Sequence, residues 1–498
     1  MSEFETIALL ANAQSRLLLL DIVRELKKRH GSTVHLYCWT KEEVAYYEKR
    51  NEDGALASII QAPTLANLAL EEPADPAAAI ETAREWEAKI GRTYASMNVA
   101  NRHLGRGYAL GGFYHPRSKQ ALESTDNSTI NAYNRHFEYW ENEIREKAIT
   151  LVLGGPAEIP CICRVMGVPY RKLAGSRHKN LHFWTCNEFN ESELLPAAYK
   201  DMDLSAFSRH VLDKPYKLVG AVDAQFLKRT RISNLAGRLA DMFLRHMYWR
   251  IRGYEKARGY RLYDQIYMLY RMWRDSRRMC GKEMVRLADL ENTRFVFFPL
   301  ATEPEVALQQ FSPEFFFQHT AIAALSRDLP AGVKLVVKEA SVGVGRRPDN
   351  MYDQIAELKN VVWMDIREQG FAVAQKADAV AVITGSSGFE AATTGTPVIS
   401  FGAHNHYNML PHVFHISDLS ALAPAIAKIF DGKLDREEAA QCGAAYLQAV
   451  VDTSFDLGAY DYVDMSSYDD AVIAGACDAL EREFPAALGS ADMMRSAV

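Results

Sequence analysis

The stretch that most constrains the fold lies at residues 380–402 and reads VAVITGSSGFEAATTGTPVISFG. Its start, with residue 379, is an apolar, β-branched run that predicts a strand buried on both faces. A turn of glycines and hydroxyl residues follows at 384–388, then a short helical segment at 389–394 and a second buried strand at 398–401. This order predicts a strand–turn–helix–strand unit with an exposed helix N-terminus.

Such a helix N-terminus favours anionic oxygens, because unpaired N–H groups and the helix dipole point at them. We therefore expect a site for a nucleotide sugar, with Glu390 one turn into the helix and placed to reach a diol beside the anion. The alternative is an ordinary connection between strands, with a serine as N-cap and Glu390 in the first turn. The stretch alone leaves both interpretations open.

Length and composition bound the rest of the chain. Its 498 residues predict two or three domains, and 48% hydrophobic with 24% charged residues is typical of a soluble globular protein. A net charge of −6 argues against a general nucleic-acid binder, so no nucleic-acid partner is expected. The start lacks a basic region before its apolar part, which argues against a secretory signal. Seven scattered cysteines favour reduced thiols in the cytoplasm over a zinc site.

The first half of the chain alternates strand and helix patterns. A strand at 5–11, a helix at 16–29 and a strand at 33–38 predict a doubly wound α/β domain, whose crevice lies at the carboxyl ends of its strands. A later polar loop at 101–118 is rich in glycine, tyrosine and cations. Together with the basic turn at 176–179 it supplies the candidate acceptor-binding residues Arg102, Arg106, His115, Arg117 and Arg177. The alternative for the loop is a solvated surface segment.

A carboxylate follows the predicted strand at 148–153, which ends in the sequence GGPAE. Because it comes just past the carboxyl end of a strand, Glu158 is the candidate general base or nucleophile. The alternative is that Glu158 is only a first-turn residue of the helix predicted at 159–166.

Residues 228–278 form a basic, aromatic window. They hold 14 Lys and Arg against four acids, interleaved with Tyr and Trp. Basic helices with aromatic residues suit the surface of an anionic membrane, and they also suit a nucleic-acid backbone. The remaining alternative is a helical bridge between domains, with buried aromatics and solvated arginines.

A second α/β domain begins near residue 292. Its predicted strands at 295–298, 333–337, 361–364 and 379–383 direct their carboxyl ends into one crevice. A loop at 403–411 adds Tyr407. Besides the residues of the turn at 384–388 and Glu390, the candidate donor-binding residues are Glu303, Glu305, Lys338, Arg346, Arg347 and Tyr407.

Several of these motifs, in this order, resemble the GT-B glycosyltransferases of bacterial capsule and surface polysaccharides, nearest the β-Kdo transferases. The resemblance is carried by FFPLATEPE (297–305), LPAGVKLVVKEA (329–340), GRRPDNMY (345–352), NVVWMD (360–365) and ITGSSGFEAATTGTPVISFG (383–402). The chain departs from that pattern at Ala301 and Ala340, where relatives commonly have histidine.

The resemblance implies roles for individual residues. Ser386, Ser387 and Gly388 would meet phosphate, Glu390 would meet ribose, and Lys338 would lie near the donor. The donor would be a nucleotide sugar, an acidic one such as Kdo linked to CMP, and the acceptor a glycan or glycolipid. Neither a metal nor a further cofactor is expected, since the helix N-terminus with Lys338, Arg346 or Arg347 could neutralise the leaving phosphate.

The expected fold class is α/β of the GT-B type, with two Rossmann-like doubly wound domains and a helical insert. Predicted domains are an acceptor-side domain at 1–200, a basic insert at 201–290, a nucleotide-sugar domain at 291–430, and C-terminal helices at 431–498 that pack back on the fold. The expected location is cytoplasmic, peripheral on the inner face of the plasma membrane if the window at 228–278 binds it. The alternatives are an epimerase or hydrolase of nucleotide sugars on the same fold, and a non-catalytic glycan-binding component, suggested by Ala301 and Ala340.

Overall fold

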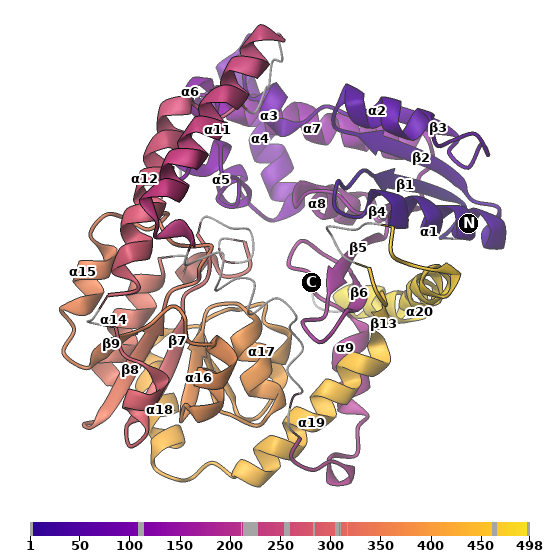
Figure 1. The fold of residues 1–498 in the computed structure, drawn as a ribbon. Coiled ribbons are helices and arrows are strands. Elements are labelled where there is room, and N and C mark those ends of the chain that lie inside the picture. Colours follow the sequence, from indigo (N-terminus) through magenta and orange to yellow (C-terminus); the bar gives the residue numbers. More distant parts are fainter. Residues whose placement is uncertain are drawn as a thin grey trace. The chain divides into compact units, whose positions relative to one another are not determined.

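The chain divides by its internal packing into two units, each built on its own sheet (Figure 1). The first unit comprises residues 1–97, 124–202 and 447–498, and the second comprises 98–123 and 203–446. The computed structural model describes residues 3–107, 114–210, 212, 228–252, 259–281, 284–303, 308, 310–315, 317–460 and 466–495.

The first unit contains a seven-stranded sheet in the order β13-β6-β5-β4-β1-β2-β3. The strands from β3 to β5 are parallel, and β6 and β13 add to that edge in antiparallel fashion. The order β3-β2-β1-β4-β5 is that of a doubly wound nucleotide-binding sheet. The strands are β1 Thr6–Leu10, β2 Thr33–Cys38, β3 Ser58–Gln61, β4 Leu151–Leu153, β5 Tyr170–Gly175, β6 Leu181–Thr185 and β13 Phe455–Asp456.

Helices of the first unit begin and end at residues suited to those positions. Asp75 caps α4 by accepting hydrogen bonds from the amides of Ala77 and Ala78, Pro76 is its first residue, and Gly91 ends it in the left-handed conformation. The helices are α1 Arg16–His30, α2 Lys41–Glu48, α3 Leu65–Leu68, α4 Pro76–Ile90, α5 Tyr94–Asn98, α7 Asp126–Glu146, α8 Glu158–Met166, α9 Leu194–Lys200 and α20 Asp470–Arg495.

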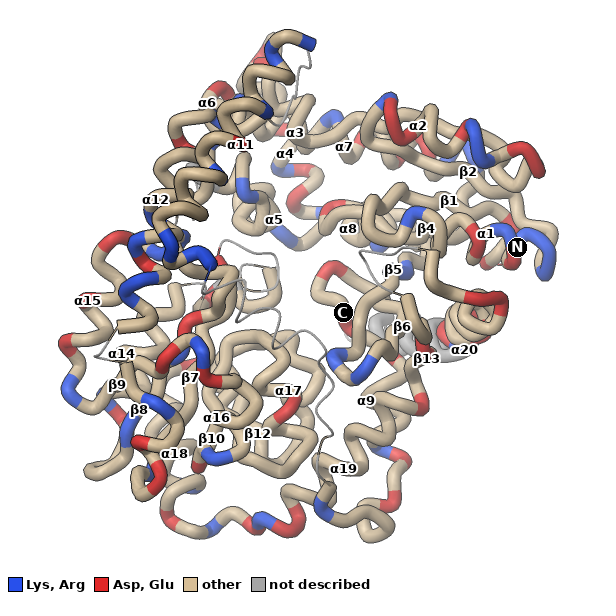
Figure 2. Tube along the Cα trace, viewed as in Figure 1, with Lys and Arg blue, Asp and Glu red and all other residues tan. Residues whose placement is uncertain are grey.

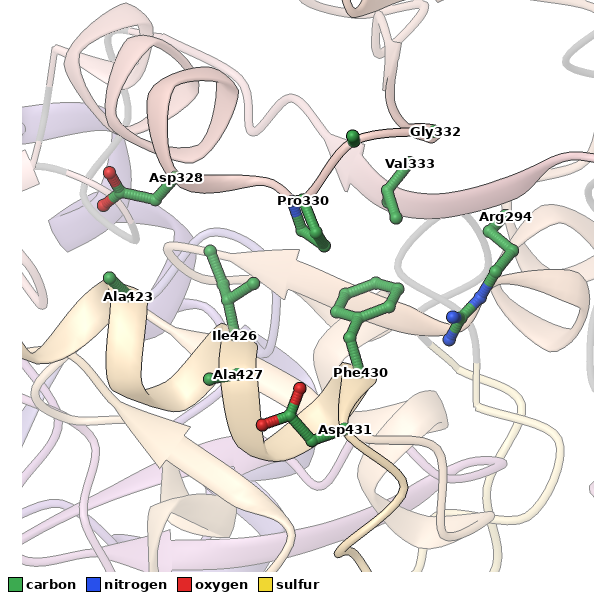
Figure 3. A pocket seen from close by; sticks show the side chains of 11 residues that line it. Arg294, Asp328, Pro330, Gly332, Val333, Ala423, Ile426, Ala427, Phe430 and Asp431 are labelled. Carbon is green, nitrogen blue, oxygen red and sulfur yellow. The ribbon is translucent and has the colours of Figure 1, made fainter.

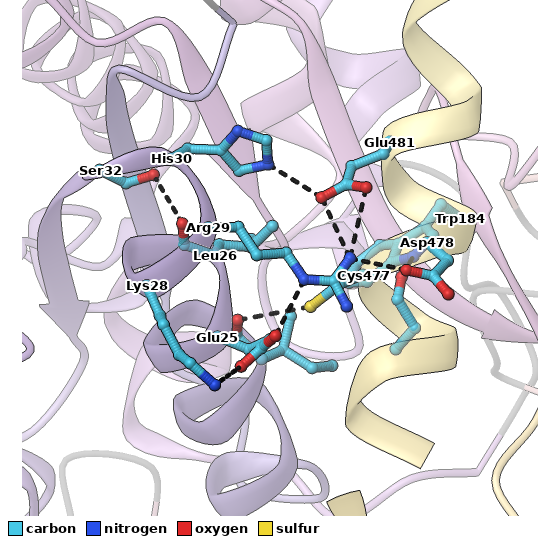
Figure 4. Close-up of polar contacts among 12 residues, drawn as sticks. Glu25, Leu26, Lys28, Arg29, His30, Ser32, Trp184, Cys477, Asp478 and Glu481 are labelled. Atoms are coloured by element: carbon cyan, nitrogen blue, oxygen red, sulfur yellow. Dashed lines mark hydrogen bonds and ion pairs between the residues drawn. The ribbon is translucent and has the colours of Figure 1, made fainter. Parts of the chain in front are cut away.

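The C-terminal helix α20 packs on α1 in this unit (Figure 4). The guanidinium of Arg29 donates hydrogen bonds to Asp478 (2.6 Å) and Glu481 (3.2 Å), and the indole of Trp184 donates to the carbonyl of Ala476 (2.9 Å). Buried apolar side chains of both helices, among them Leu26 and Leu480, join the same core. The end of the chain therefore belongs to the fold of the first unit.

The second unit contains a six-stranded sheet in the order β12-β11-β10-β7-β8-β9. Every pairing in it is parallel. Relative to chain order this is the 3-2-1-4-5-6 arrangement of a Rossmann sheet. The strands are β7 Arg294–Pro299, β8 Val333–Lys338, β9 Val361–Met364, β10 Ala379–Val382, β11 Val398–Ser400 and β12 Val413–His415.

Helices cover this second sheet and extend from it. Their apolar faces pack on strand residues such as Phe298, Leu335 and Ile399 to form one core. The helices are α6 Lys119–Glu123, α11 Ile232–Ile251, α12 Leu262–Arg278, α14 Gln318–Asp328, α15 Met351–Ala356, α16 Gly370–Lys376, α17 Ser386–Thr393 and α18 Leu422–Phe430, while α19 Arg436–Thr453 runs from the second unit into the first.

The predicted fold class is confirmed, because both sheets are mainly parallel and follow the doubly wound order. The division into units differs from the predicted domain boundaries at residues 98–123, which lie with the second unit, and at the end of the chain, which lies with the first. The basic window at 228–278 forms α11 and α12 within the second unit, apart from its residues 253–258, which are outside the described residues.

Candidate functional site

The second sheet changes its winding direction between β7 and β10. From β7 the chain proceeds to β8 and β9 on one side, and β10 returns to the other side of β7. In open parallel sheets, ligands bind outside the carboxyl ends of the strands at such a switch point. Here these ends are Pro299 on β7 and Val382 on β10. The stretch at residues 380–402 therefore lies at the switch point itself.

Helix α17 begins immediately after β10. Its N-cap is Gly385, with φ at 130°, and Ser386 and Ser387 are its first two residues, so the alternative of a serine N-cap is wrong. Ser386 is exposed and Ser387 is half-buried, whereas Glu390 is buried. The first-turn amides of α17 have no partner within the helix, which makes this turn a place for an anion.

Gly388 allows Tyr407 and Val382 to pack closely against the first turn of α17. A Cβ atom built on Gly388 would lie 2.2 Å from the Tyr407 hydroxyl and 2.7 Å from a Val382 methyl. The buried Tyr407 ring belongs to the 3₁₀ turn His406–Met409. The absence of a side chain at Gly388 therefore lets Tyr407 approach the start of α17.

An asparagine that the sequence did not single out fixes the same loop. The Asn405 side-chain amide donates hydrogen bonds to the carbonyl of Ile383 (2.8 Å) and the hydroxyl of Ser400 (2.9 Å). These bonds join the ends of β10 and β11. Gly402 permits the contact, since a Cβ atom there would lie 2.6 Å from the Asn405 amide nitrogen.

A buried ion cluster lies past the ends of β7 and β8. The Arg347 guanidinium donates to both oxygens of Glu339 (2.8 and 2.6 Å), to Glu303, and to the Ala301 carbonyl (2.7 Å). The Tyr352 hydroxyl donates to Glu339 (2.8 Å). Because Arg347 and both carboxylates are fully buried, the cluster holds the strand ends in place rather than presenting its charges to solvent.

One cation therefore faces two carboxylates in this cluster. Burial raises the pKa of Glu303 to about 7, with Glu339 acting in the same direction and Arg347 opposing both. Gln318, also missed from the sequence, holds the backbone of Ala301 on both sides: it accepts from the amide (2.7 Å) and donates to the carbonyl (3.0 Å). A sequence signal for Glu339 existed, since it directly follows the β8 strand, but nothing pointed to Gln318.

Helix α12 holds the basic loop that contains Arg346. The buried Arg271 guanidinium donates to the carbonyls of Gly345 (3.1 Å) and Arg347 and forms an ion pair with Asp349. Gly345, with φ at 85°, would carry a Cβ atom only 2.7 Å from the backbone of α12. The loop is therefore anchored by residues inside the basic window.

Residues 114–118, the described end of the polar loop predicted at 101–118, dock on the same elements. The amide of Tyr114 donates to the Arg346 carbonyl (2.7 Å), and Arg117 donates to Asp264 of α12 through its Nε (2.7 Å) and Nη2 (3.0 Å). Burial lowers the pKa of His115 to about 3, with the charges of Arg102 and Arg346 adding to that effect. His115 is therefore neutral at pH 7.

The structure thus brings candidate acceptor and donor residues together in the second unit. The charges of Arg102 and Arg346 both act on His115, and Arg117 lies two residues from His115 in the same unit. Lys338, which is half-buried, is the last residue of strand β8. Two candidates fall outside this description. Glu305 lies outside the described residues, and Arg106 lies in the turn Leu104–Gly107 with its side chain undescribed.

In the first unit, Glu158 is the first residue of α8 and follows the carboxyl end of β4. Lys172 lies on the adjacent strand β5, one residue beyond the pairing of Leu153 with Arg171. Burial lowers the pKa of Lys172, and the Glu158 carboxylate opposes that shift. The half-buried Glu158 carboxylate therefore lies near enough to the Lys172 amine, at the carboxyl ends of these strands, for its charge to act on it.

A buried carboxylate missed from the sequence fixes α8 at this edge. Glu188 accepts from Arg164 of α8 (3.0 and 3.2 Å) and pairs with Arg92 (3.4 Å). Burial works against its charge, yet the Arg164 hydrogen bonds hold the pKa of Glu188 below its ordinary value. The remaining acceptor candidate, Arg177, occupies the turn after β5 with φ at 70°.

Within the described ranges, no group of three or more His, Cys, Asp or Glu could hold a metal ion. Over those same ranges, no helix has the length and apolar content needed to cross a membrane.

A separate hollow of about 370 Å³ lies at the opposite edge of the second sheet (Figure 3). Arg294 and Val333, the first residues of β7 and β8, line it with Phe430 of α18. The Arg294 guanidinium lies 4.7 Å from the Phe430 ring centroid. Because this edge carries the amino ends of the strands, the hollow is distinct from the switch point.

Two doubly wound units of this kind define an α/β fold of the GT-B type, and solved structures match it across most of the chain. A β-Kdo 2,4-transferase, KpsC of Thermosulfurimonas dismutans, matches with 13% identity over 60% of this chain and 80% of that chain, at a TM-score of 0.29. Anabaena HepE, solved with UDP and glucose, matches with 12% identity over 90% and 96%, at 0.30.

A UDP-GlcNAc 2-epimerase from Neisseria meningitidis, bound to UDP-GlcNAc, matches with 8% identity over 90% of this chain and 99% of that chain, at a TM-score of 0.27. The matches thus include β-Kdo transferases, which the sequence motifs resemble. No family model matches the chain, and a search of curated proteins finds no match.

Proposed function

We propose that this protein is a glycosyltransferase that moves a sugar from a nucleotide donor to a glycan or glycolipid acceptor. The observation that carries the proposal is the start of α17 at the β7/β10 switch point, with Ser386 exposed at the helix N-terminus. Amides and hydroxyls in that position suit the phosphate of a nucleotide sugar. Binding energy and electrostatic stabilisation of the leaving phosphate would come from α17 and from Lys338.

The proposed donor carries an acidic sugar linked to CMP, as in Kdo transfer. Support comes from Arg102 and Arg346, whose charges both lower the pKa of the buried His115, so that two cations lie near that residue. Guanidinium groups recognise carboxylates with directed hydrogen bonds. Replacing Arg346 with Gln should weaken binding of an acidic-sugar nucleotide about tenfold while leaving the bare nucleotide unchanged, since one charge-assisted hydrogen bond is worth about that much.

The proposed catalytic carboxylate is Glu158, at the carboxyl end of β4 and beside Lys172. An oxocarbenium-like transition state needs a carboxylate near the anomeric carbon, acting as base or nucleophile. Glu158→Gln should lower kcat by at least about 100-fold with the donor Kd unchanged. Glu193→Gln, in the same unit, is the matched charge control.

The deciding experiment is a thermal-shift screen with CMP, UDP, GDP and their sugars, followed by transfer assays with the nucleotide sugar that raises the Tm. Transfer to a lipid-linked glycan supports the proposal. Release of sugar or epimer without an acceptor would instead indicate a hydrolase or epimerase, and nucleotide binding without turnover would indicate a binding component.

We also propose that the enzyme works at the inner face of the plasma membrane, which would bring it to a lipid-linked acceptor. The support is the basic character of α11, whose Lys and Arg positions are coloured blue in Figure 2. Clusters of arginine attract anionic lipid headgroups.

A further inference from the structure

Helix α11 exposes a long apolar stripe. Phe243, Leu244, Met247, Tyr248 and Ile251 are all exposed, with Leu244 at 63% and Ile251 at 78%. Their spacing of three and four residues places them along one face of the helix. Large apolar side chains gathered on one face of a helix mark an interaction surface, whereas scattered ones do not.

The opposite face of α11 is the one that packs in the second unit. Met242 is its buried residue, and His246, one turn further, lies 3.2 Å from the Gln265 amide of α12. At 100° per residue, positions 242 and 246 lie across the helix from 244, 247 and 251. The apolar stripe is therefore not explained by the packing of α11 on α12.

The charges around the stripe indicate what it contacts. Arg238, Arg245 and Arg250 lie on the same helix and Arg252 caps its end, against one acid, Asp241. An apolar face bordered by arginines is complementary to a bilayer with anionic headgroups. Arginines in the middle of the helix place it in the plane of the interface rather than across the membrane.

We infer that α11 inserts the stripe of Phe243, Leu244, Met247, Tyr248 and Ile251 into the headgroup and acyl boundary of an anionic bilayer. The arginines remain at the headgroups, and Tyr248 lies where aromatic rings favour the interface. This inference rests on the proposed membrane location of the enzyme, and adds that apolar insertion, not charge alone, supplies the binding.

The test is co-sedimentation of the full-length protein with vesicles of phosphatidylglycerol and phosphatidylcholine, compared with pure phosphatidylcholine. The parent should bind the anionic vesicles and keep part of that binding in about 0.5 M salt, where charges are screened within a few ångströms. The variant L244Q/M247Q/I251Q should bind at least about tenfold more weakly, since three apolar side chains no longer leave water. Glutamine keeps the helix propensity of these exposed positions.

Two controls keep the outcomes separate. L122Q/V342Q changes two exposed apolar side chains elsewhere in the second unit and should bind as the parent does. R238Q/R245Q/R250Q should lose the preference for anionic lipid. If the parent binds no vesicles, the membrane location fails together with the inference. If binding depends on the arginines but not on the stripe, only the insertion fails.

An oligomeric readout completes the test. If sedimentation velocity finds a parent dimer that L244Q/M247Q/I251Q dissociates, while vesicle binding is unchanged, the stripe is an interface between two copies and the inference is overturned. Vesicle binding is measured without donor or acceptor, so its result does not depend on whether the chain transfers a sugar.

Discussion

At the scale of single residues, the buried cluster of Glu303, Glu339 and Arg347 has more negative than positive charge. Glu303 has its pKa raised to about 7 by burial in the folded state, above the 4.5 of an ordinary glutamate. A raised carboxyl pKa contributes stability that is fully present below the unfolded pKa and is lost as the pH rises through the folded pKa. The loss therefore falls between about pH 4.5 and 7.

We expect Glu303→Gln to become more stable relative to the parent as the pH rises from 5 to 8, by roughly 1 to 3 kcal/mol. Glutamine keeps an oxygen for Arg347 but removes the charge that burial disfavours. Thermal unfolding at a series of pH values measures the difference. Glu314→Gln, at an exposed position of the same unit, is the control and should show no such trend. A difference in Tm that does not vary with pH would contradict the expectation.

Gly388 was predicted to meet phosphate, and that role stays a prediction. Its packing role is separately testable, because a Cβ atom there would collide with Tyr407 and Val382. Gly388→Ala should cost about 1 to 3 kcal/mol of unfolding free energy, as overpacking does. Adding Tyr407→Phe should recover part of this cost. Gly370→Ala, at a helix start with open space around it, should be neutral in the same denaturant titration.

At the scale of elements, Arg271 connects α12 to the loop that carries Arg346. Arg271→Met removes the donors for the carbonyls of Gly345 and Arg347, which would then be buried without those hydrogen bonds. We expect a loss of about 2 to 4 kcal/mol and faster hydrogen exchange in the loop at 341–349. Arg277→Met, exposed on the same helix, should have little effect. Unchanged exchange in the loop would contradict this account of α12 as its support.

Strands and most helices could be predicted from the sequence, because their signals are local. The strands at 33–38 and 361–364 have the predicted bounds. Helix α17 begins three residues earlier than predicted, since serine and glycine have low helix propensity and the close approach of Tyr407 to Gly388 is a tertiary contact. Local pattern cannot anticipate such tertiary contacts.

The candidate site was less predictable for the same reason. Arg347 was predicted to bind the donor, but its burial depends on Glu303 and Glu339, 44 and eight residues away in sequence. The docking of residues 114–118 depends on Arg117 and Asp264, 147 residues apart. Pairings across such separations are decided by the fold, and a single sequence carries no signal for them.

At the scale of the whole molecule, the central proposal is that the second unit binds the phosphate of a nucleotide sugar. It rests on the two doubly wound sheets and on the position of the start of α17. Placing a carboxylate at this helix start tests the claim without loss of the fold, because an acid in the first turn stabilises a helix. Ser386→Glu does this at an exposed position. Ala77→Glu, exposed in the first turn of α4, makes the same charge change in the other unit.

The most direct measurement is a calorimetric titration of the parent and these two variants with the nucleotide that raises the Tm most. Ser386→Glu should weaken nucleotide binding at least about tenfold through repulsion of the phosphate, with its Tm in the absence of ligand unchanged. Ala77→Glu should bind as the parent does. Equal nucleotide affinity in the parent and Ser386→Glu would contradict the claim that the phosphate lies at the start of α17.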